Sequence, residues 1–147
     1  LILSEPGCLK QLLEIHEKTQ SSVLGVFSAP ETQVSNYGVI SSKNIDGIEK
    51  VDGIVEKPKP ADAPSNLAVF GRYILSKDIF LNIEQTKPGL NNEIQLTDAI
   101  QDLISNQDVF ALEFEGRRFD CGSKEGYISA IIDRALSIDK YKSIIEK

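Results

Sequence analysis

Short apolar runs alternate with stretches of helical periodicity along this chain. The short continuous apolar run at 22–27 predicts a buried strand, and 66–75 is the most strand-like segment of the chain. Alternating apolar and polar side chains predict a further strand at 109–114. Apolar side chains at helical spacing predict helices over about 5–19 and about 124–145.

Two more helices are predicted between the strands at 66–75 and 109–114. Ser76 is expected to cap the first of them. Its apolar face is formed by Ile79, Phe80 and Ile83. A loop over 87–92 follows, and the second helix begins at or near Thr97, as an entry that packs beneath the candidate site. Strands that alternate with helices indicate the α/β class.

The segment between 36 and 57 predicts several short strands joined by turns. The first strand is predicted at 36–40, where two β-branched residues follow Gly38, and 41–46 is interpreted as a turn. Residues 48–51 alternate and predict an exposed hairpin strand, which Asp52-Gly53 ends as a second turn signal. This hairpin indicates a mixed sheet rather than a purely parallel one.

Glu56 and Lys57 lie at the end of the last of these strands. Pro58 follows them and cannot donate to a sheet ladder, so the strand stops there. In open α/β sheets, ligands bind at the carboxyl ends of the strands. A carboxylate could accept hydrogen bonds from sugar hydroxyls and an ammonium could meet a phosphate. Neighbouring strand residues point to opposite faces, so both reach one ligand only if the strand end twists or the ligand lies across its tip. The alternative is a solvated strand end.

Charge and hydropathy narrow the classes of partner. The formal net charge is −6 over 147 residues, and a nucleic-acid surface requires a basic stripe instead. The longest apolar runs are far shorter than a membrane span. We therefore expect neither nucleic acid nor a membrane as partner.

The cysteine and histidine content excludes several kinds of site. Cys8 and Cys121 are the only cysteines, and without a visible secretory signal they indicate a reducing compartment. We therefore expect a cytoplasmic protein in which they form no disulfide. His16 is the only histidine, and no nucleophile or metal partner lies near it in the sequence, so we expect neither a Cys/His metal site nor a Ser/His/Asp or Cys/His catalytic set.

Two further positions allow both a functional and a structural interpretation. Gly38 precedes two β-branched residues and marks either close backbone approach to a ligand or a bulge. Asp120 follows a predicted strand and precedes a helix. It could hold Mg²⁺ if substrate phosphates and waters complete the octahedron, or it could cap the last helix or turn the loop.

The first residues have an unusual pattern. Leu1-Ile2-Leu3 is an apolar run with no preceding turn, and the chain contains no methionine. A native amino terminus is more often polar and frayed. We expect that this sequence begins inside a fold, in the middle of a strand.

Five segments, taken in order, resemble the carboxyl-terminal half of the bacterial UTP–glucose-1-phosphate uridylyltransferases. They are Tyr37-Gly38-Val39, Val55-Glu56-Lys57-Pro58-Lys59, 63–73, 92–100 and 120–127. Glu-Lys-Pro alone occurs in many sugar nucleotidyltransferases. Glu-Ile-Gln-Leu-Thr-Asp at 93–98 combined with Asp-Cys-Gly at 120–122 resembles the uridylyltransferase branch more than the thymidylyltransferase branch.

This resemblance implies an enzyme that converts UTP and glucose 1-phosphate to UDP-glucose and pyrophosphate. It implies a Rossmann-like nucleotidyltransferase α/β/α sandwich with a mixed sheet, of which 1–147 would be the sugar-phosphate-binding part of a single domain. The amino-terminal nucleotide-binding half would be absent, so the fragment alone is expected to be inactive. We also expect a homo-oligomer, because a cut sheet exposes unpaired edges.

The resemblance also implies a role for five residues. Glu56 would bind glucose hydroxyls, and Lys57 would meet the sugar phosphate as the catalytic lysine. The backbones of Gly38 and Val69 would contact the sugar, and Asp120 would be one of two aspartates that hold Mg²⁺. Two alternatives stay open: transfer to another sugar phosphate or from dTTP, and a non-catalytic relative.

Overall fold

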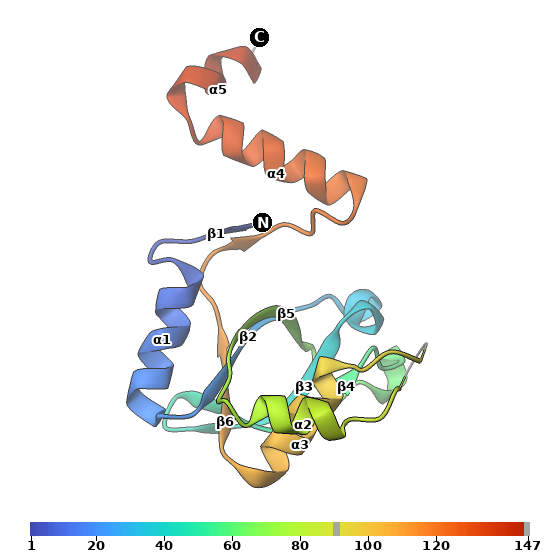
Figure 1. Cartoon of the computed structure of the whole chain (residues 1–147). Coiled ribbons are helices and arrows are strands. Elements are labelled where there is room, and N and C mark those ends of the chain that lie inside the picture. Colours follow the sequence, from blue (N-terminus) through green and yellow to red (C-terminus); the bar gives the residue numbers. More distant parts are fainter. Residues whose placement is uncertain (90–91, 146–147) are drawn as a thin grey trace. The chain divides into compact units, whose positions relative to one another are not determined.

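The computed structural model describes residues 1–89 and 92–145 (Figure 1). Leu90 and Asn91 of the predicted loop at 87–92 lie outside the described residues. The strands are β1 (Ile2–Leu3), β2 (Ser22–Ser28), β3 (Gly38–Ile45), β4 (Ile48–Glu56), β5 (Leu67–Ile74), β6 (Val109–Glu113) and β7 (Arg117–Arg118). The α-helices are α1 (Cys8–Thr19), α2 (Ile79–Gln85), α3 (Leu96–Asn106), α4 (Lys124–Leu136) and α5 (Asp139–Ile145), and the 3₁₀ turns are η1 (Glu31–Asn36) and η2 (Pro60–Asp62).

The chain folds as two compact units, which are described separately. The larger unit comprises Leu9–Phe114 and contains the main sheet. The smaller unit combines Leu1–Cys8 with Glu115–Lys147. The assignment of 1–147 to one nucleotidyltransferase domain stays a prediction.

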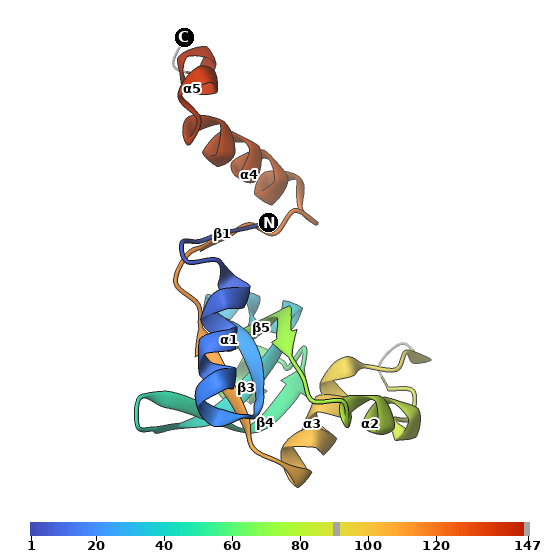
Figure 2. The same cartoon turned by 60° about the vertical axis from the view of Figure 1, so that its left-hand side comes forward.

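The sheet of the larger unit is mixed, as predicted, and its five strands close on themselves. The strand order is β2-β5-β3-β4-β6. β6 runs parallel to β2 and antiparallel to β4, so it closes the ring of strands. In both views α1 and the α2–α3 pair lie on opposite sides of the strands (Figures 1 and 2). The α/β class is therefore confirmed.

The hairpin of the mixed sheet turns at a different place from the one predicted. β3 continues through Ile45, which pairs with Ile48, so Asp46-Gly47 forms the two-residue loop. Both loop residues have positive φ (53° and 85°), which Asp-Gly pairs adopt readily. The predicted turns at 41–46 and at Asp52-Gly53 are wrong. Asp52 is instead the extra residue of a β-bulge, where the register shifts between Ser41 and Ser42.

The core of the larger unit lies between the sheet and the α2–α3 pair. It is built mainly from β-branched strand residues and the inner face of α3. Its buried members are Leu24, Val26, Ile40, Val51, Ile54, Val69, Ile79, Ala99, Ile100, Leu103, Val109 and Ala111.

The predicted helices need three corrections. The first begins at Cys8 and not at about residue 5. On α2, Ile79 is buried as expected, but Phe80 is 68% exposed and does not belong to the apolar face. Asp78, not Ser76, precedes α2, and it makes no side-chain capping bond.

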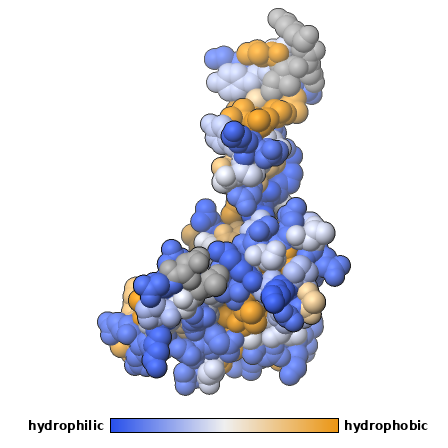
Figure 3. Space-filling view, turned by 90° about the vertical axis from the view of Figure 1, so that its right-hand side faces the viewer, coloured by the Kyte–Doolittle hydropathy of each residue, from blue (hydrophilic) through white to orange (hydrophobic). Residues whose placement is uncertain are grey.

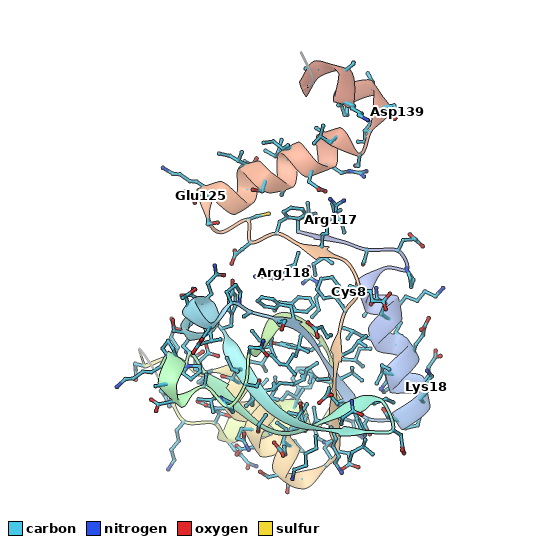
Figure 4. All side chains as sticks on the ribbon, turned by 180° about the vertical axis from the view of Figure 1, so that it is seen from behind. Cys8, Lys18, Arg117, Arg118, Glu125 and Asp139 are labelled. Carbon is cyan, nitrogen blue, oxygen red and sulfur yellow. The ribbon has the colours of Figure 1, made fainter. Side chains whose placement is uncertain are left out.

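The smaller unit contains one short ladder and the last two helices. β1 pairs with β7 in antiparallel register, and Figure 4 shows Arg117 and Arg118 on opposite sides of β7. The single helix predicted over 124–145 is wrong, since α4 and α5 are separate. The Ser137 hydroxyl donates to the Arg134 carbonyl (2.7 Å) and so competes with the helical ladder where α4 ends.

The sequence predicted neither a disulfide nor a membrane-spanning segment, and both can be compared with the described residues. No disulfide joins Cys8, which is buried, to Cys121, which is exposed. Among the described residues, no helix is both long and apolar enough to span a membrane.

Adjacent residues on α2 allow a matched test of this core. We expect Ile79→Ala to lower the free energy of unfolding by about 2–5 kcal/mol, because it leaves a cavity beside α3. Phe80→Ala should change it by no more than about 0.5 kcal/mol, because the ring is exposed. Urea denaturation of both variants measures the difference, and equal losses would contradict this packing.

Candidate functional site

Three strands bring the predicted site residues of the larger unit to one place. Gly38 begins β3 and pairs with Glu56, which ends β4, because the two strands are antiparallel. β5 lies on the other side of β3, in register at Val39 and Ala68. Val69 follows directly on β5. The register therefore places Gly38 between Glu56 and Val69.

Gly38 is a point of close approach and not a bulge. A Cβ on Gly38 would lie 2.9 Å from Thr97 Cγ2, 3.0 Å from Val69 Cγ2 and 3.3 Å from Glu56 Oε2. The register around Gly38 is regular, and the shift in this hairpin occurs at 41–42. Of the two interpretations of this glycine, the bulge is therefore wrong. A backbone contact with a ligand stays a prediction.

The backbone at Lys57 lets two neighbouring side chains meet. Lys57 has φ +45°, a left-handed conformation that is unusual for lysine. Its N–H donates to the Tyr37 carbonyl (3.0 Å), which holds the chain after the strand has ended. Its Nζ then lies 3.6 Å from Glu56 Oε1. The strand end thus twists so that Glu56 and Lys57 lie close enough to contact one ligand.

The pair is only partly shielded from solvent. The Glu56 side chain is 19% exposed and the Lys57 side chain 46% exposed. Nearby, burial raises the pKa of Tyr73 to about 12, and the negative charge of Glu56 acts in the same direction. Tyr73 is therefore a neutral neighbour at physiological pH. The arrangement offers a carboxylate acceptor beside an ammonium donor.

Thr97 is a neighbour to which the sequence pattern assigned no site role. It lies in the first turn of α3, is 7% exposed, and packs its methyl group toward Gly38. Its Oγ1 has no hydrogen-bond partner among the described residues. The only sequence feature that pointed to Thr97 as a neighbour of the site was the predicted helix entry at 93–98, which was expected to pack beneath it.

Asp120 lies in the smaller unit and is described apart from the other four. Its Oδ1 accepts a hydrogen bond from the Gly122 N–H (3.1 Å), so it turns the loop. The residue that caps α4 is Ser123, whose side chain accepts from the Gly126 N–H. The capping role considered for Asp120 is therefore wrong.

The surroundings of Asp120 suit a metal that takes few protein ligands. Its side chain is 50% exposed, with Oδ2 3.9 Å from the Arg118 guanidinium. Within 1–89 and 92–145, no three His, Cys, Asp or Glu side chains group closely enough to hold a metal ion by themselves. Mg²⁺ commonly uses one or two carboxylates together with phosphates and waters. A single exposed aspartate fits that pattern, and the metal role stays a prediction.

The sequence pattern that describes the nucleotidyl transferase family matches residues 2–135, across both units. The chain therefore belongs to the nucleotidyl transferase family. Its relatives include a UTP–glucose-1-phosphate uridylyltransferase of Streptococcus pyogenes, 48% identical over 135 residues, and a second such enzyme from the M3 serotype, 46% identical. These matches cover 90% of this chain but only 44–45% of each relative. The chain thus spans about half the length of the relatives it matches.

Solved structures agree with this assignment. The fold resembles a UDP-glucose pyrophosphorylase complexed with UDP-glucose at a TM-score of 0.90 and 43% identity, over 94% of this chain and 54% of that one. The enzyme from Acinetobacter baumannii matches at 0.82 and 34% identity, over 99% of this chain and 51% of the other. The resemblance to uridylyltransferases and the nucleotidyltransferase fold are confirmed.

The crowding at Gly38 gives a direct test of the site geometry. We expect Gly38→Ala to lower the free energy of unfolding by about 1–3 kcal/mol, because the new methyl overlaps Thr97 and Val69. Gly7→Ala is the control, since a Cβ there meets nothing within 4 Å, and should change it by no more than about 0.5 kcal/mol. Thermal and urea unfolding measure both. A neutral Gly38→Ala would contradict the close approach.

Proposed function

We propose that this chain is the sugar-phosphate-binding part of an enzyme that converts UTP and glucose 1-phosphate to UDP-glucose and pyrophosphate. The observation that carries the proposal is the meeting of Glu56 and Lys57 beside Gly38. A carboxylate that only accepts hydrogen bonds suits sugar hydroxyls, and the adjacent ammonium suits the phosphate. The relatives are named as UTP–glucose-1-phosphate uridylyltransferases, which supports this choice of substrates.

The proposed chemistry needs positioning more than covalent catalysis. Glu56 accepts hydrogen bonds from the glucose ring, with the Gly38 and Val69 backbones beside it. Lys57 neutralises and orients the sugar phosphate, one oxygen of which attacks the α-phosphorus of UTP in line. A new oxygen–phosphorus bond forms while the bond from the α-phosphorus to the bridging oxygen breaks, and pyrophosphate leaves with that oxygen. No covalent enzyme intermediate is required.

Asp120 is the residue of this chain that would hold Mg²⁺. Its exposed carboxylate leaves room for phosphate and water ligands on the ion, although the hydrogen bond from Gly122 already occupies one oxygen. When bound, Mg²⁺ would neutralise charge on the phosphates. The role of Asp120 would then be to hold the positive charge of the metal ion at a defined place beside the phosphates.

The length of the match sets the scope of this proposal. About half of each relative has no counterpart in this chain, and we expect that half to supply the nucleotide contacts. The 147 residues alone should therefore have little activity. The cytoplasm is the location that we expect from the cysteine content.

The proposal is tested with the complete product of the gene. We expect pyrophosphate release from UTP, glucose 1-phosphate and Mg²⁺, and much slower release when dTTP replaces UTP. Glu56→Gln, Lys57→Ala and Asp120→Asn should each lower kcat/KM by roughly 100-fold or more, because each removes a charged contact to substrate or metal. A coupled pyrophosphate assay measures all of these rates.

Matched controls lie on the same strand. Glu49→Gln and Lys50→Ala make the same chemical changes as Glu56→Gln and Lys57→Ala, but at partly exposed positions of β4 away from the strand end. They should leave kcat/KM within about threefold of the wild-type value. Preference for dTTP would favour the thymidylyl alternative. Absence of turnover with either nucleotide would overturn the proposed function and favour a non-catalytic relative.

We also expect this chain to self-associate through its last two helices. Tyr127, Ile128, Ile131 and Ile132 on α4 and Tyr141 on α5 are 43–56% exposed. Figure 3 shows apolar surface over these helices, and a pocket of about 420 Å³ is lined by both of them together with Leu1 and Cys121. Light scattering should detect dimers or larger species, which Ile131→Asp should shift toward monomer and Leu9→Asp on α1 should not. A wild-type monomer at micromolar concentration would contradict this expectation.

A further inference from the structure

The buried hydroxyl of Thr97 lacks the bond to a helical carbonyl that several other hydroxyls of the described residues make. Thr19 in α1, Thr86 at the C-cap of α2 and Ser105 in α3 each donate to the carbonyl four residues earlier, at 2.9, 2.8 and 3.1 Å. Thr97 lies in the first turn of α3, where the residue four positions earlier is outside the helix. Its Oγ1 is buried and has no partner among the described residues. A buried hydroxyl without a partner destabilises the fold unless binding supplies one.

The position of this hydroxyl relates it to the candidate sugar site. The Thr97 methyl lies 2.9 Å from the point where a Gly38 Cβ would be, and Glu56 Oε2 lies 3.3 Å from the same point. The methyl and the hydroxyl are both attached to the Thr97 Cβ. A rotation of one third of a turn about χ1 can place Oγ1 where the methyl is now, and threonine in helices populates two such rotamers. The hydroxyl can therefore reach the side that Glu56 faces.

We propose that Thr97 is a specificity-determining residue, whose hydroxyl turns toward bound sugar phosphate and donates a hydrogen bond to a sugar hydroxyl held by Glu56. This inference rests on the proposed function of the same site. An ionised carboxylate can only accept, so a sugar hydroxyl must give its proton to Glu56. The oxygen of that hydroxyl then has lone pairs for a donor, and Thr97 has a proton without an acceptor. Together the two residues recognise one hydroxyl as both donor and acceptor.

If this proposal holds, removing the Thr97 hydroxyl should affect the stability of the free protein and its affinity for substrate in different ways. Thr97→Val keeps the shape of the side chain and removes the hydroxyl. In the free protein it should raise the unfolding temperature or leave it unchanged, because an orphan polar group is replaced by an apolar one. In the bound protein it should remove one hydrogen bond, so glucose 1-phosphate should bind about three- to tenfold more weakly.

The test uses the complete product of the gene and two variants of Thr97. Thr97→Val should raise the KM for glucose 1-phosphate by about three- to tenfold and leave the KM for UTP unchanged. Thr97→Ser keeps the hydroxyl and should restore most of the affinity. Thr86→Val is the control: it removes a hydroxyl that already donates to Asn82, so it should lower the unfolding temperature and leave both KM values unchanged.

Deoxy analogues of glucose 1-phosphate identify the hydroxyl concerned. The Thr97→Val penalty should disappear with one of the 2-, 3-, 4- or 6-deoxy compounds, because that analogue cannot make the bond in either protein. A penalty that persists with all four would overturn the inference. So would an unchanged KM, or a fall in unfolding temperature that shows a structural partner for Oγ1.

These results separate two kinds of failure. If the wild-type protein forms UDP-glucose and Thr97→Val retains the wild-type KM, only this inference fails. If the wild-type protein releases no pyrophosphate from UTP and glucose 1-phosphate, the proposed function fails and this inference fails with it.

Discussion

The absence of a side chain at Gly38 is the constraint on which the candidate site depends. Three groups from β4, β5 and the start of α3 converge within 3.3 Å of the place that a Cβ would occupy. Any other residue would force them apart, and the sheet would lose its packing against α3 at the end where β4 stops. The glycine therefore provides room for neighbouring side chains, and this is how it brings Glu56 and Val69 together.

The left-handed backbone of Lys57 follows from the same geometry. A regular strand would point Glu56 and Lys57 to opposite faces, and only a change of backbone direction places them 3.6 Å apart. That change costs about 1–2 kcal/mol for a residue with a Cβ. The hydrogen bond from Lys57 N–H to Tyr37 holds the conformation. A glycine would relieve the strain, but it would also remove the ammonium.

Local sequence patterns predicted elements better than they predicted register. The runs at 22–27 and 66–75 became β2 and β5 almost unchanged, because burial of β-branched side chains is a local signal. The two Asp-Gly pairs, at 46–47 and 52–53, carry the same local turn signal. Only the pairing of β3 with β4 decides that the first is the turn and the second a bulge. Thr97 was missed for a similar reason, since its contact with Gly38 depends on how α3 packs against the sheet.

Two departures from ordinary local rules lie beside Gly38 and Glu56. Lys57 has a left-handed backbone, and the Thr97 hydroxyl has no hydrogen-bond partner among the described residues. Two other left-handed residues with a Cβ have local explanations: Asp46 lies in the hairpin loop and Gln20 follows the end of α1. Lys57 and Thr97 have none within their own elements. Sequences retain such costs where binding requires them, so their gathering at one strand end supports a binding site independently of any resemblance to known enzymes.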